Sequence, residues 1–176
     1  MARRLPDNID IHTHNLHPDH PAIVCIDPVE TERLPDDVAM MSVGVHPWNA
    51  AKADDAVFAR MSAMLDDPRV VAIGEIGLDR ARGPELDVQE PVFERQLAMA
   101  RERDLPVVLH AVRADDVILR YRRTHPTGQW IIHSYRGKPA SARPLLDAGI
   151  DLSFGPRYNP ATLAATPPGR RYRDTD

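Results

Sequence analysis

The chain has 176 residues, of which 43% are hydrophobic and 27% charged, and its formal net charge is −4. This length predicts a single domain over residues 1–176 with a substantial core. No apolar run approaches the roughly 20 residues of a membrane span, so we expect no membrane partner. The negative charge argues against a broad basic surface for nucleic acid, but a small phosphate site could take its positive charge from bound metal.

The single cysteine, Cys25, excludes an internal disulfide and lies in an apolar run. We expect it to be a small buried hydrophobe in a reduced compartment. Residues 1–7 carry basic side chains without the apolar segment that follows them in a signal peptide. The cytoplasm is therefore the expected location.

Residues 8–14, Asn-Ile-Asp-Ile-His-Thr-His, predict a strand with a period of two. The isoleucines point to one side, whereas Asp10, His12 and His14 point to the other. His12 and His14 then lie on one face with alpha carbons roughly 6.5 Å apart, so their rings can converge on one cation. The alternative is a solvated polar face at a sheet edge. We favour metal binding because more histidines and carboxylates follow at later strand ends.

Apolar runs that predict strands alternate with amphipathic segments that predict helices. Further strands are expected at residues 22–27, 38–45, 69–76, 106–110, 130–133 and 150–154, with an eighth at 172–176. Helices are expected at residues 54–66, 88–104, 115–123 and 139–148.

This alternation indicates an α/β fold with a buried parallel sheet, and up to eight strands suggest a (β/α)8 TIM-like barrel. The chain is shorter than the roughly 200 residues at which such barrels usually begin. Short or missing helices after the first two strands account for the difference. We therefore expect a compact barrel that is incomplete at the C-terminus.

Polar residues lie where the apolar strands end, which is the end of a barrel where chemistry gathers. They come from four strands and are His12, His14, Glu75, His110 and His133. Asp176 would add a carboxylate from the eighth strand. One such histidine would be a structural hydrogen-bonder, but that role does not account for the whole set. Imidazole and carboxylate together suit zinc, manganese or a similar divalent ion without choosing among them.

Several motifs occur in one order along almost the whole chain. They are the Asp-Ile-His-Thr-His of 10–14, the Gly-Val-His-Pro-Trp of 44–48, the Ala-Ile-Gly-Glu-Ile-Gly-Leu-Asp of 72–79, Gln89, Phe93, Gln96, and residues 105–110, 132–133 and 152–155. In these motifs the chain resembles the TatD-related metal-dependent deoxyribonucleases, a branch of the metal-dependent hydrolase superfamily. The resemblance implies a two-metal centre of zinc, manganese or magnesium that cleaves phosphodiester bonds in DNA.

By position, the resemblance also implies a role for each ligand. One metal is held by His12, His14 and Asp176, the other by His110 and His133, and Glu75 bridges both. Two cations roughly 3.5–4 Å apart can activate a water and stabilise the attacking and leaving oxygens. Glu75 and Asp176 are the expected catalytic residues, with Asp176 as acceptor of the nucleophile's proton.

Other residues near the expected metals are candidates for substrate binding. Arg113 could grip two phosphate oxygens, and Arg136 has a similar position, although either could be a solvated arginine. Trp48 and Tyr135 could stack on bases or instead cap the core. His46 should line the pocket without being a primary ligand.

The remaining histidines, His17, His20 and His125, are expected at the surface. Asp10 and Asp79 are expected to orient their neighbours by hydrogen bonding rather than bind metal.

Residues 170–176, Arg-Arg-Tyr-Arg-Asp-Thr-Asp, depart from the family's apolar last strand and its following helix. Three arginines are poor material for a buried strand. This predicts a disordered eighth strand that leaves the first metal without its carboxylate. It also predicts an open flank that a second copy of the chain would cover in a homodimer.

Three functions follow from these patterns. The leading one is a metal-dependent phosphodiesterase that acts on DNA from a strand end. The second is a hydrolase of another small phosphoester or amide, because this kind of metal centre serves several bond types. The third is a catalytically weakened metal-binding protein.

Overall fold

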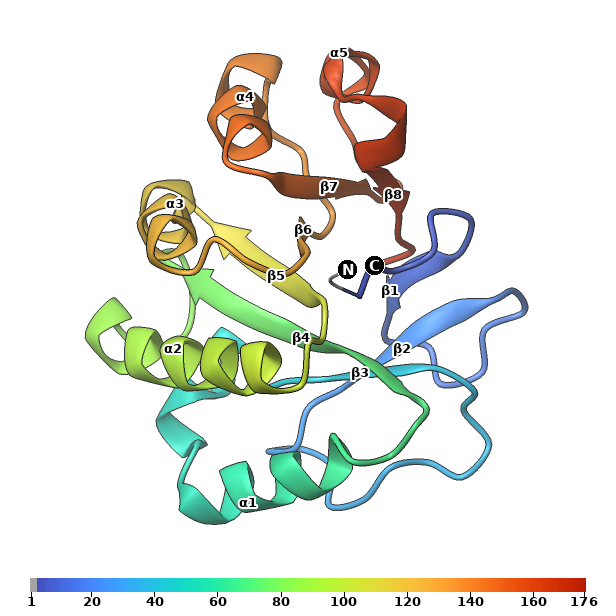
Figure 1. Cartoon of the computed structure of the whole chain (residues 1–176), viewed down its shortest axis with the longest axis vertical. Helices are drawn as coiled ribbons and strands as arrows, with labels where there is room; N and C mark the ends of the chain where they lie inside the picture. Colours follow the sequence, from blue (N-terminus) through green and yellow to red (C-terminus); the bar gives the residue numbers. More distant parts are fainter. Residues whose placement is uncertain (1–2) are drawn as a thin grey trace.

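The computed structural model describes residues 3–176, and its strands form one closed parallel barrel in sequence order (Figure 1). The strands are β1 (Asp10–Thr13), β2 (Ala22–Ile26), β3 (Met41–Val43), β4 (Val70–Asp79), β5 (Val107–Val112), β6 (Trp130–Ile132), β7 (Ile150–Phe154) and β8 (Arg171–Arg173). The barrel closes where Asp10 of β1 pairs with Arg173 of β8. The predicted TIM-like barrel is thereby confirmed.

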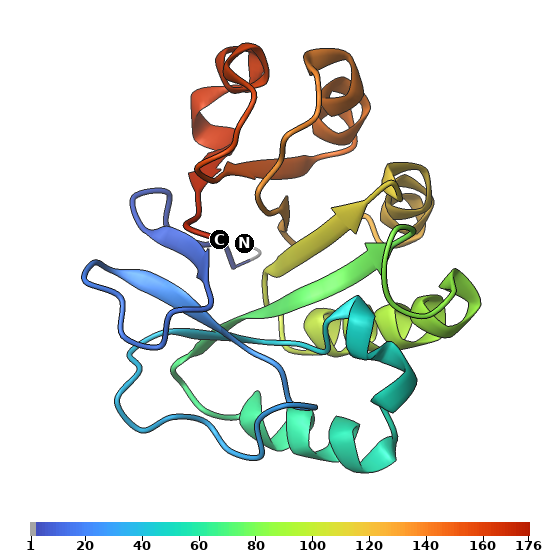
Figure 2. The ribbon, with the colours of Figure 1, turned by 180° about the vertical axis from the view of Figure 1, so that it is seen from behind.

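Helices cover the barrel from β3 onward, whereas only loops follow β1 and β2 (Figures 1 and 2). They are α1 (Asp55–Met64), α2 (Leu86–Glu102), α3 (Asp115–Thr124), α4 (Pro139–Asp147), α5 (Pro160–Ala165) and the 3-10 turns η1 (Pro47–Lys52) and η2 (Pro168–Arg170). The expected absence of helices after the first two strands is confirmed. None of the helices within residues 3–176 is long and apolar enough to cross a membrane.

Two separate apolar clusters form the core. The larger lies between strands and helices, where α1 contributes Phe58 and Met61 and α2 contributes Phe93 and Leu97. The smaller draws on strands from all sides of the closed barrel, so its members meet in the interior. They are Leu5, Ile9, Ile11, Ile23, Ala72, Val108, Ile131 and Tyr172.

This interior cluster determines where the polar residues lie. Side chains two positions apart on a strand share a face. Positions two residues beyond Ile23, Val108, Ile131 and Tyr172 therefore also face the interior, nearer the C-terminal ends of the strands. These positions are occupied by Cys25, His110, His133 and Asp174.

A polar network closes the other end of the barrel. The carboxylate of Asp151 accepts hydrogen bonds from Arg4 at 2.8 Å, from Arg170 at 2.6 Å and from the Gln129 amide at 2.9 Å. Gln129 also accepts a hydrogen bond from the backbone N–H of Leu5 at 2.8 Å. The segment before β1 is thus fixed against the barrel floor.

The arginines near β8 do not enter the barrel, and the expected disorder of the eighth strand is wrong. Of the three residues of β8, only Tyr172 is buried. Arg170 pairs with Asp151, Arg171 donates to the carbonyl of Thr166, and Arg173 is exposed. The strand needs only one apolar side chain because its other residues face outward. The barrel itself is therefore complete at β8.

Candidate metal centre

Glu75 of β4 lies at the centre of a cluster of histidines and is 3% exposed. Its Oε1 lies 2.6 Å from the Nδ1 of His110, 2.6 Å from the Nε2 of His133 and 3.3 Å from the Nε2 of His46. Its Oε2 lies 3.4 Å from the Nε2 of His12 and 3.5 Å from the Nε2 of His14. The two carboxylate oxygens thus face two different groups of imidazoles.

Asp176 reaches the same cluster from beyond β8. Its Oδ1 lies 3.4 Å from the Nε2 of His14, and its Oδ2 lies 3.9 Å from the Nδ1 of His133. Thr175 fixes this segment beside β1, because its N–H donates to the carbonyl of His12 at 3.3 Å. The structure therefore brings all six predicted ligands together, including the carboxylate that was expected to be lost with a disordered strand.

Several imidazole nitrogens in this cluster are buried without a hydrogen-bond partner. Within residues 3–176 these are both ring nitrogens of His12 and the Nδ1 of His133. A buried polar atom without a partner costs free energy, so such atoms mark a place where a ligand is needed. A divalent cation fits this donor set, since imidazole and carboxylate are the usual ligands of zinc and manganese.

The electrostatics of the cluster also favour a cation. Burial would raise the pKa of Glu75, but the imidazoles of His133, His110 and His12 hold it well below its usual range. The carboxylate is therefore an anion in a buried place, where a metal ion would neutralise it.

The histidines titrate in different directions. Burial lowers the pKa of His12, and the nearby His133 adds to this effect, so His12 is held in the neutral form that binds metals. Burial opposes a charge on His133, but Glu75 raises the pKa of His133. The hydrogen bond to Glu75 also raises the pKa of His14. Metal binding would displace protons from the latter two rings.

Residues 3–176 contain three groups of ligand atoms that lie within 4.8 Å of one another. They are His12–His133–Asp176, His46–Glu75–His110 and His12–His14–Cys25. His46 is therefore closer to the ligands than sequence reasoning placed it, with its Nε2 3.3 Å from the Nδ1 of His110. The sequence feature that could have indicated this was the position of His46 at the end of a strand.

Cys25 differs from the buried hydrophobe that was expected. Its side chain is partly exposed, and its Sγ accepts a hydrogen bond from the backbone N–H of Glu75 at 3.2 Å. Burial raises the pKa of Cys25, and the charge of Glu75 raises it further. The sequence feature that could have indicated this contact is the position of Cys25, two residues after Ile23 on β2 and so on the same interior face.

Asp79 supports His110 and Trp48 from the end of β4. Its Oδ2 lies 3.0 Å from the Nε2 of His110 and accepts a hydrogen bond from the Nε1 of Trp48 at 2.7 Å. The amide of Gln89 on α2 accepts a hydrogen bond from the N–H of Asp79 at 2.8 Å and so holds this strand end in place. Such a carboxylate orients a histidine ring and makes it a better ligand.

Asp10, the first residue of β1, makes comparable contacts. It accepts hydrogen bonds from the N–H of His12 at 3.0 Å and from the hydroxyl of Thr175 at 2.5 Å. Its Oδ2 also lies 3.0 Å from the Nε2 of His20. His20 was expected to be a free surface residue, but it is half-buried against this carboxylate because the loop after β1 folds back.

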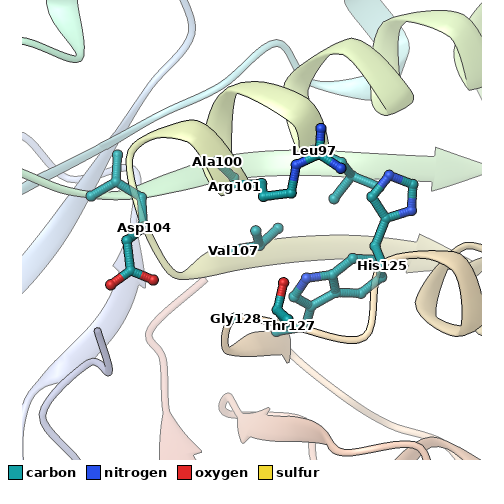
Figure 3. Close-up of a pocket in the computed structure, with 10 residues that line it drawn as sticks. Leu97, Ala100, Arg101, Asp104, Val107, His125, Thr127 and Gly128 are labelled. Atoms are coloured by element: carbon teal, nitrogen blue, oxygen red, sulfur yellow. The ribbon is translucent and has the colours of Figure 1, made fainter. Parts of the chain in front are cut away.

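The other two histidines lie away from the cluster. His17 is exposed, as expected. His125 is partly buried and lines a small pocket of about 50 Å³ together with Arg101 of α2 (Figure 3). Trp130 also lines this pocket. Neither contributes to the metal centre.

Two clefts open onto the cluster. The first has a volume of about 640 Å³ and is lined in part by His14, Cys25, His46, Trp48 and Glu75. The second has a volume of about 470 Å³ and is lined in part by Arg113, His133, Tyr135 and Arg136. His110 and Asp176 line both clefts. A bound molecule could therefore pass over the cluster from one cleft to the other.

The predicted substrate-binding residues divide into exposed and buried ones. Trp48 is 41% exposed, and the guanidinium of Arg82 lies 4.1 Å from the centre of its ring. Arg113 and Arg136 line the second cleft, and within residues 3–176 neither guanidinium has an ion-pair partner. Tyr135 is only 6% exposed, and burial raises its pKa to about 12. Tyr135 therefore lines the second cleft with little of its ring exposed, as a residue that caps the core would.

The sequence model of a known family matches most of the chain. The family is described as TatD related DNase, and its model matches residues 27–168. This chain belongs to that family. The membership confirms the resemblance that the histidine and Gly-Glu-Ile-Gly-Leu-Asp motifs indicated.

Curated TatD-family relatives agree with this assignment. The chain is 30% identical over 120 residues to the uncharacterized metal-dependent hydrolase YjjV of Escherichia coli (strain K12), which covers 65% of this chain and 46% of the relative. It is 32% identical over 134 residues to the 3′-5′ ssDNA/RNA exonuclease TatD of Rahnella sp. (strain Y9602), which covers 72% of this chain and 50% of the relative. The chain thus spans about half the length of the curated relatives it matches.

Solved structures show the same fold. The crystal structure of YjjV, a TatD homolog from Escherichia coli K12, matches with a TM-score of 0.75 at 23% identity, covering 96% of this chain and 78% of that one. A TatD family hydrolase from Entamoeba histolytica matches with a TM-score of 0.77 at 17% identity, covering 100% of this chain and 74% of that one. The barrel is therefore the TatD barrel.

Proposed function

We propose that this TatD-family chain is a metal-dependent hydrolase that cleaves phosphodiester bonds in DNA with two divalent cations. The observation that carries the proposal is the convergence of five imidazoles on the buried carboxylate of Glu75. Buried ring nitrogens of His12 and His133 have no hydrogen-bond partner within residues 3–176, which supports occupancy by metal. Cytoplasmic action is part of the proposal, because it keeps Cys25 reduced.

Each carboxylate oxygen of Glu75 would serve a different cation. His12, His14 and Asp176 would hold the ion on the Oε2 side, and His110 and His133 the ion on the Oε1 side. When bound, the cations would lower the pKa of a water and stabilise charge on the attacking and leaving oxygens. A bridging carboxylate would offset part of their mutual repulsion.

The chain's own residues would position the substrate and move the proton. Arg113 and Arg136 line the second cleft, where guanidinium groups can bind phosphate oxygens in pairs. Trp48 is exposed at the first cleft and can stack on a base. Asp176 is partly exposed beside His14 and would accept the proton of the attacking water.

The substrate is proposed to be a single strand with a free end. The relative from Rahnella is named a 3′-5′ ssDNA/RNA exonuclease. This chain has few exposed arginines at its clefts and a net charge of −4, so it lacks the broad basic surface that a long duplex would need.

The test is hydrolysis of single-stranded DNA labelled at one end or the other, with zinc, manganese or magnesium added to metal-free protein. Stepwise shortening from one end is expected with the wild type. Glu75→Gln should slow it by roughly 1,000-fold, whereas the matched change of the exposed Glu32 to Gln should leave the rate unchanged. Bound metal without any cleavage of DNA or of a phosphoester would overturn the proposal and leave only the metal-binding function.

A second candidate is hydrolysis of a smaller phosphoester or amide. The observation that favours it is the negative net charge together with only two arginines on the second cleft. Release of product from a small phosphoester or amide panel, with labelled DNA left intact, would favour this candidate.

We also propose that the flank formed by β1 and β2 meets a second copy of the chain. The structure has only loops after these two strands, whereas helices cover the rest of the barrel. Light scattering across a range of protein concentrations would test this, and a constant monomer mass would overturn it.

A further inference from the structure

Cys25 lies where a metal ligand is needed. It follows the interior residue Ile23 by two positions on β2, so its side chain faces the C-terminal mouth of the barrel. Its Sγ lies within 4.8 Å of ligand nitrogens of both His12 and His14. Cys25 is partly exposed and lines the first cleft.

His12 supplies an independent sign that something binds at this place. The side chain is 0% exposed, yet within residues 3–176 neither ring nitrogen has a hydrogen-bond partner. Its Nε2 is 3.4 Å from the Oε2 of Glu75. The backbone N–H of Glu75 in turn donates to the Sγ of Cys25 at 3.2 Å. The sulfur, the carboxylate and the orphaned ring therefore surround the same small volume.

We propose that Cys25 is a sulfur ligand of the cation held by His12 and His14, and that it makes this position selective for zinc over magnesium. The inference rests on the metal centre of the proposed function and deepens it by naming the preferred metal. Thiolate sulfur favours zinc, whereas magnesium takes oxygen ligands and keeps much of its water. The donors at hand are then the imidazole nitrogens of His12 and His14, the sulfur of Cys25 and the carboxylates of Glu75 and Asp176, and zinc accepts each of these donor types.

Binding requires no oxidant or reductant. The S–H bond of Cys25 breaks, its electron pair forms the bond to the cation, and the proton leaves to water through the first cleft. Burial and the charge of Glu75 disfavour a negative sulfur by raising the pKa of Cys25, the hydrogen bond from the N–H of Glu75 offsets part of this, and a bound cation would offset the rest. A sulfur that merely filled space would make none of these contributions.

Cobalt substitution gives a direct test, because a thiolate bound to Co²⁺ produces a strong near-ultraviolet charge-transfer band. The chain contains one cysteine, so such a band must come from Cys25. Metal-free wild type, Cys25→Ser and Ser42→Ala would each be titrated with Co²⁺. Ser42 is the matched control, because it is buried beside Cys25 in the β2–β3 pairing but contributes no sulfur.

The wild type and Ser42→Ala should show the band, and Cys25→Ser should lack it. Zinc should remove the band by displacing cobalt, and magnesium should not. Cys25→Ser should also weaken zinc binding by more than about tenfold while changing magnesium binding little.

Two results would overturn the proposal in distinguishable ways. Visible cobalt absorption without the near-ultraviolet band in wild type would remove Cys25 from the ligands but leave the metal centre intact. Absence of any cobalt or zinc binding would overturn the metal centre as well.

X-ray absorption of the zinc-loaded wild type gives a test that needs no variant. A sulfur scatterer at about 2.3 Å from zinc would support the proposal. A shell of nitrogen and oxygen alone would overturn it, even if Cys25→Ser failed to fold.

Discussion

Two buried carboxylates, Asp151 and Glu75, lie toward opposite ends of the barrel interior and have different kinds of partner. Asp151 is 2% exposed and accepts hydrogen bonds from Arg4, Arg170 and Gln129. Glu75 is equally buried but faces only imidazoles with its carboxylate oxygens. Burial alone would make the two residues look equivalent.

Their partners explain the difference in role. A guanidinium keeps its proton at any ordinary pH, so the charge of Asp151 is neutralised permanently. An imidazole exchanges protons near neutrality and can bind a metal instead. The Asp151 end is therefore an ion-paired structural network, and the Glu75 end carries the donor atoms of a candidate metal site.

When the two carboxylates are changed one at a time, the largest expected effect is on catalysis. Glu75→Gln removes the negative charge that two cations would share, so turnover should fall by roughly 1,000-fold, or about 4 kcal/mol in the barrier. Single-turnover kinetics on labelled DNA would measure it. The charge-matched change Asp151→Asn should leave turnover of the folded fraction near wild type, and equal losses in the two variants would contradict the contrast.

The free energy of unfolding of the metal-free protein should depend more on Asp151 than on Glu75. Asp151→Ala leaves Arg170 and Gln129 without their buried acceptor, so the free energy of unfolding should fall by roughly 3 kcal/mol. This is at the lower end of the range for a broken buried pair, because Arg4 and Arg170 are partly exposed. Urea denaturation of metal-free protein would measure the change, and a loss below that of Glu75→Ala would argue against it.

The effect of metal on the Tm should distinguish the Glu75 end of the barrel from the Asp151 end. A ligand at 100 times its Kd stabilises the folded state by about 2.7 kcal/mol. Zinc at that excess should raise the Tm of wild type and of Asp151→Asn, but not that of Glu75→Gln. Differential scanning calorimetry with and without a chelator would show this, and a zinc shift in Glu75→Gln would assign the metal elsewhere.

The smallest effect is expected where a carboxylate acts through a histidine. Asp79→Asn weakens the support of His110 and should lower metal affinity by about tenfold, without changing metal stoichiometry. Asp116→Asn is the matched control, since Asp116 only pairs with Arg80 at the surface. Competition with a metal-sensing dye would measure both, and equal affinities would show that Asp79 does not orient the ring.

Much of the fold could be predicted because the strands and helices follow from patterns of neighbouring residues. The alternation of apolar strands and amphipathic helices located β1 to β7 and α1 to α4. The short helix α5 was missed because its six residues, Pro160–Ala165, are too few for a periodic pattern. The eighth strand was predicted wrongly because its neighbouring arginine, Arg170, pairs with Asp151 at the barrel floor, while Arg171 donates to the carbonyl of Thr166.

The candidate site was predictable where strand ends carry histidines and carboxylates. The contacts of Cys25 and His20 were not, because they depend on how distant strands and a loop meet once the barrel closes. The burial of Tyr135 depends likewise on the path of the loop after β6. Sequence patterns specify which side chains share a face, but they do not specify which faces meet.

The interior hydrocarbon layer of Ile23, Ala72, Val108 and Ile131 lies between these two polar networks. It touches both ends of the barrel but gives neither a polar path to the other. Changes at sites that share no partners usually have additive effects. Selection could therefore alter substrate choice at the mouth of the barrel while strengthening its floor, and an engineer could combine libraries from the two ends with little interference.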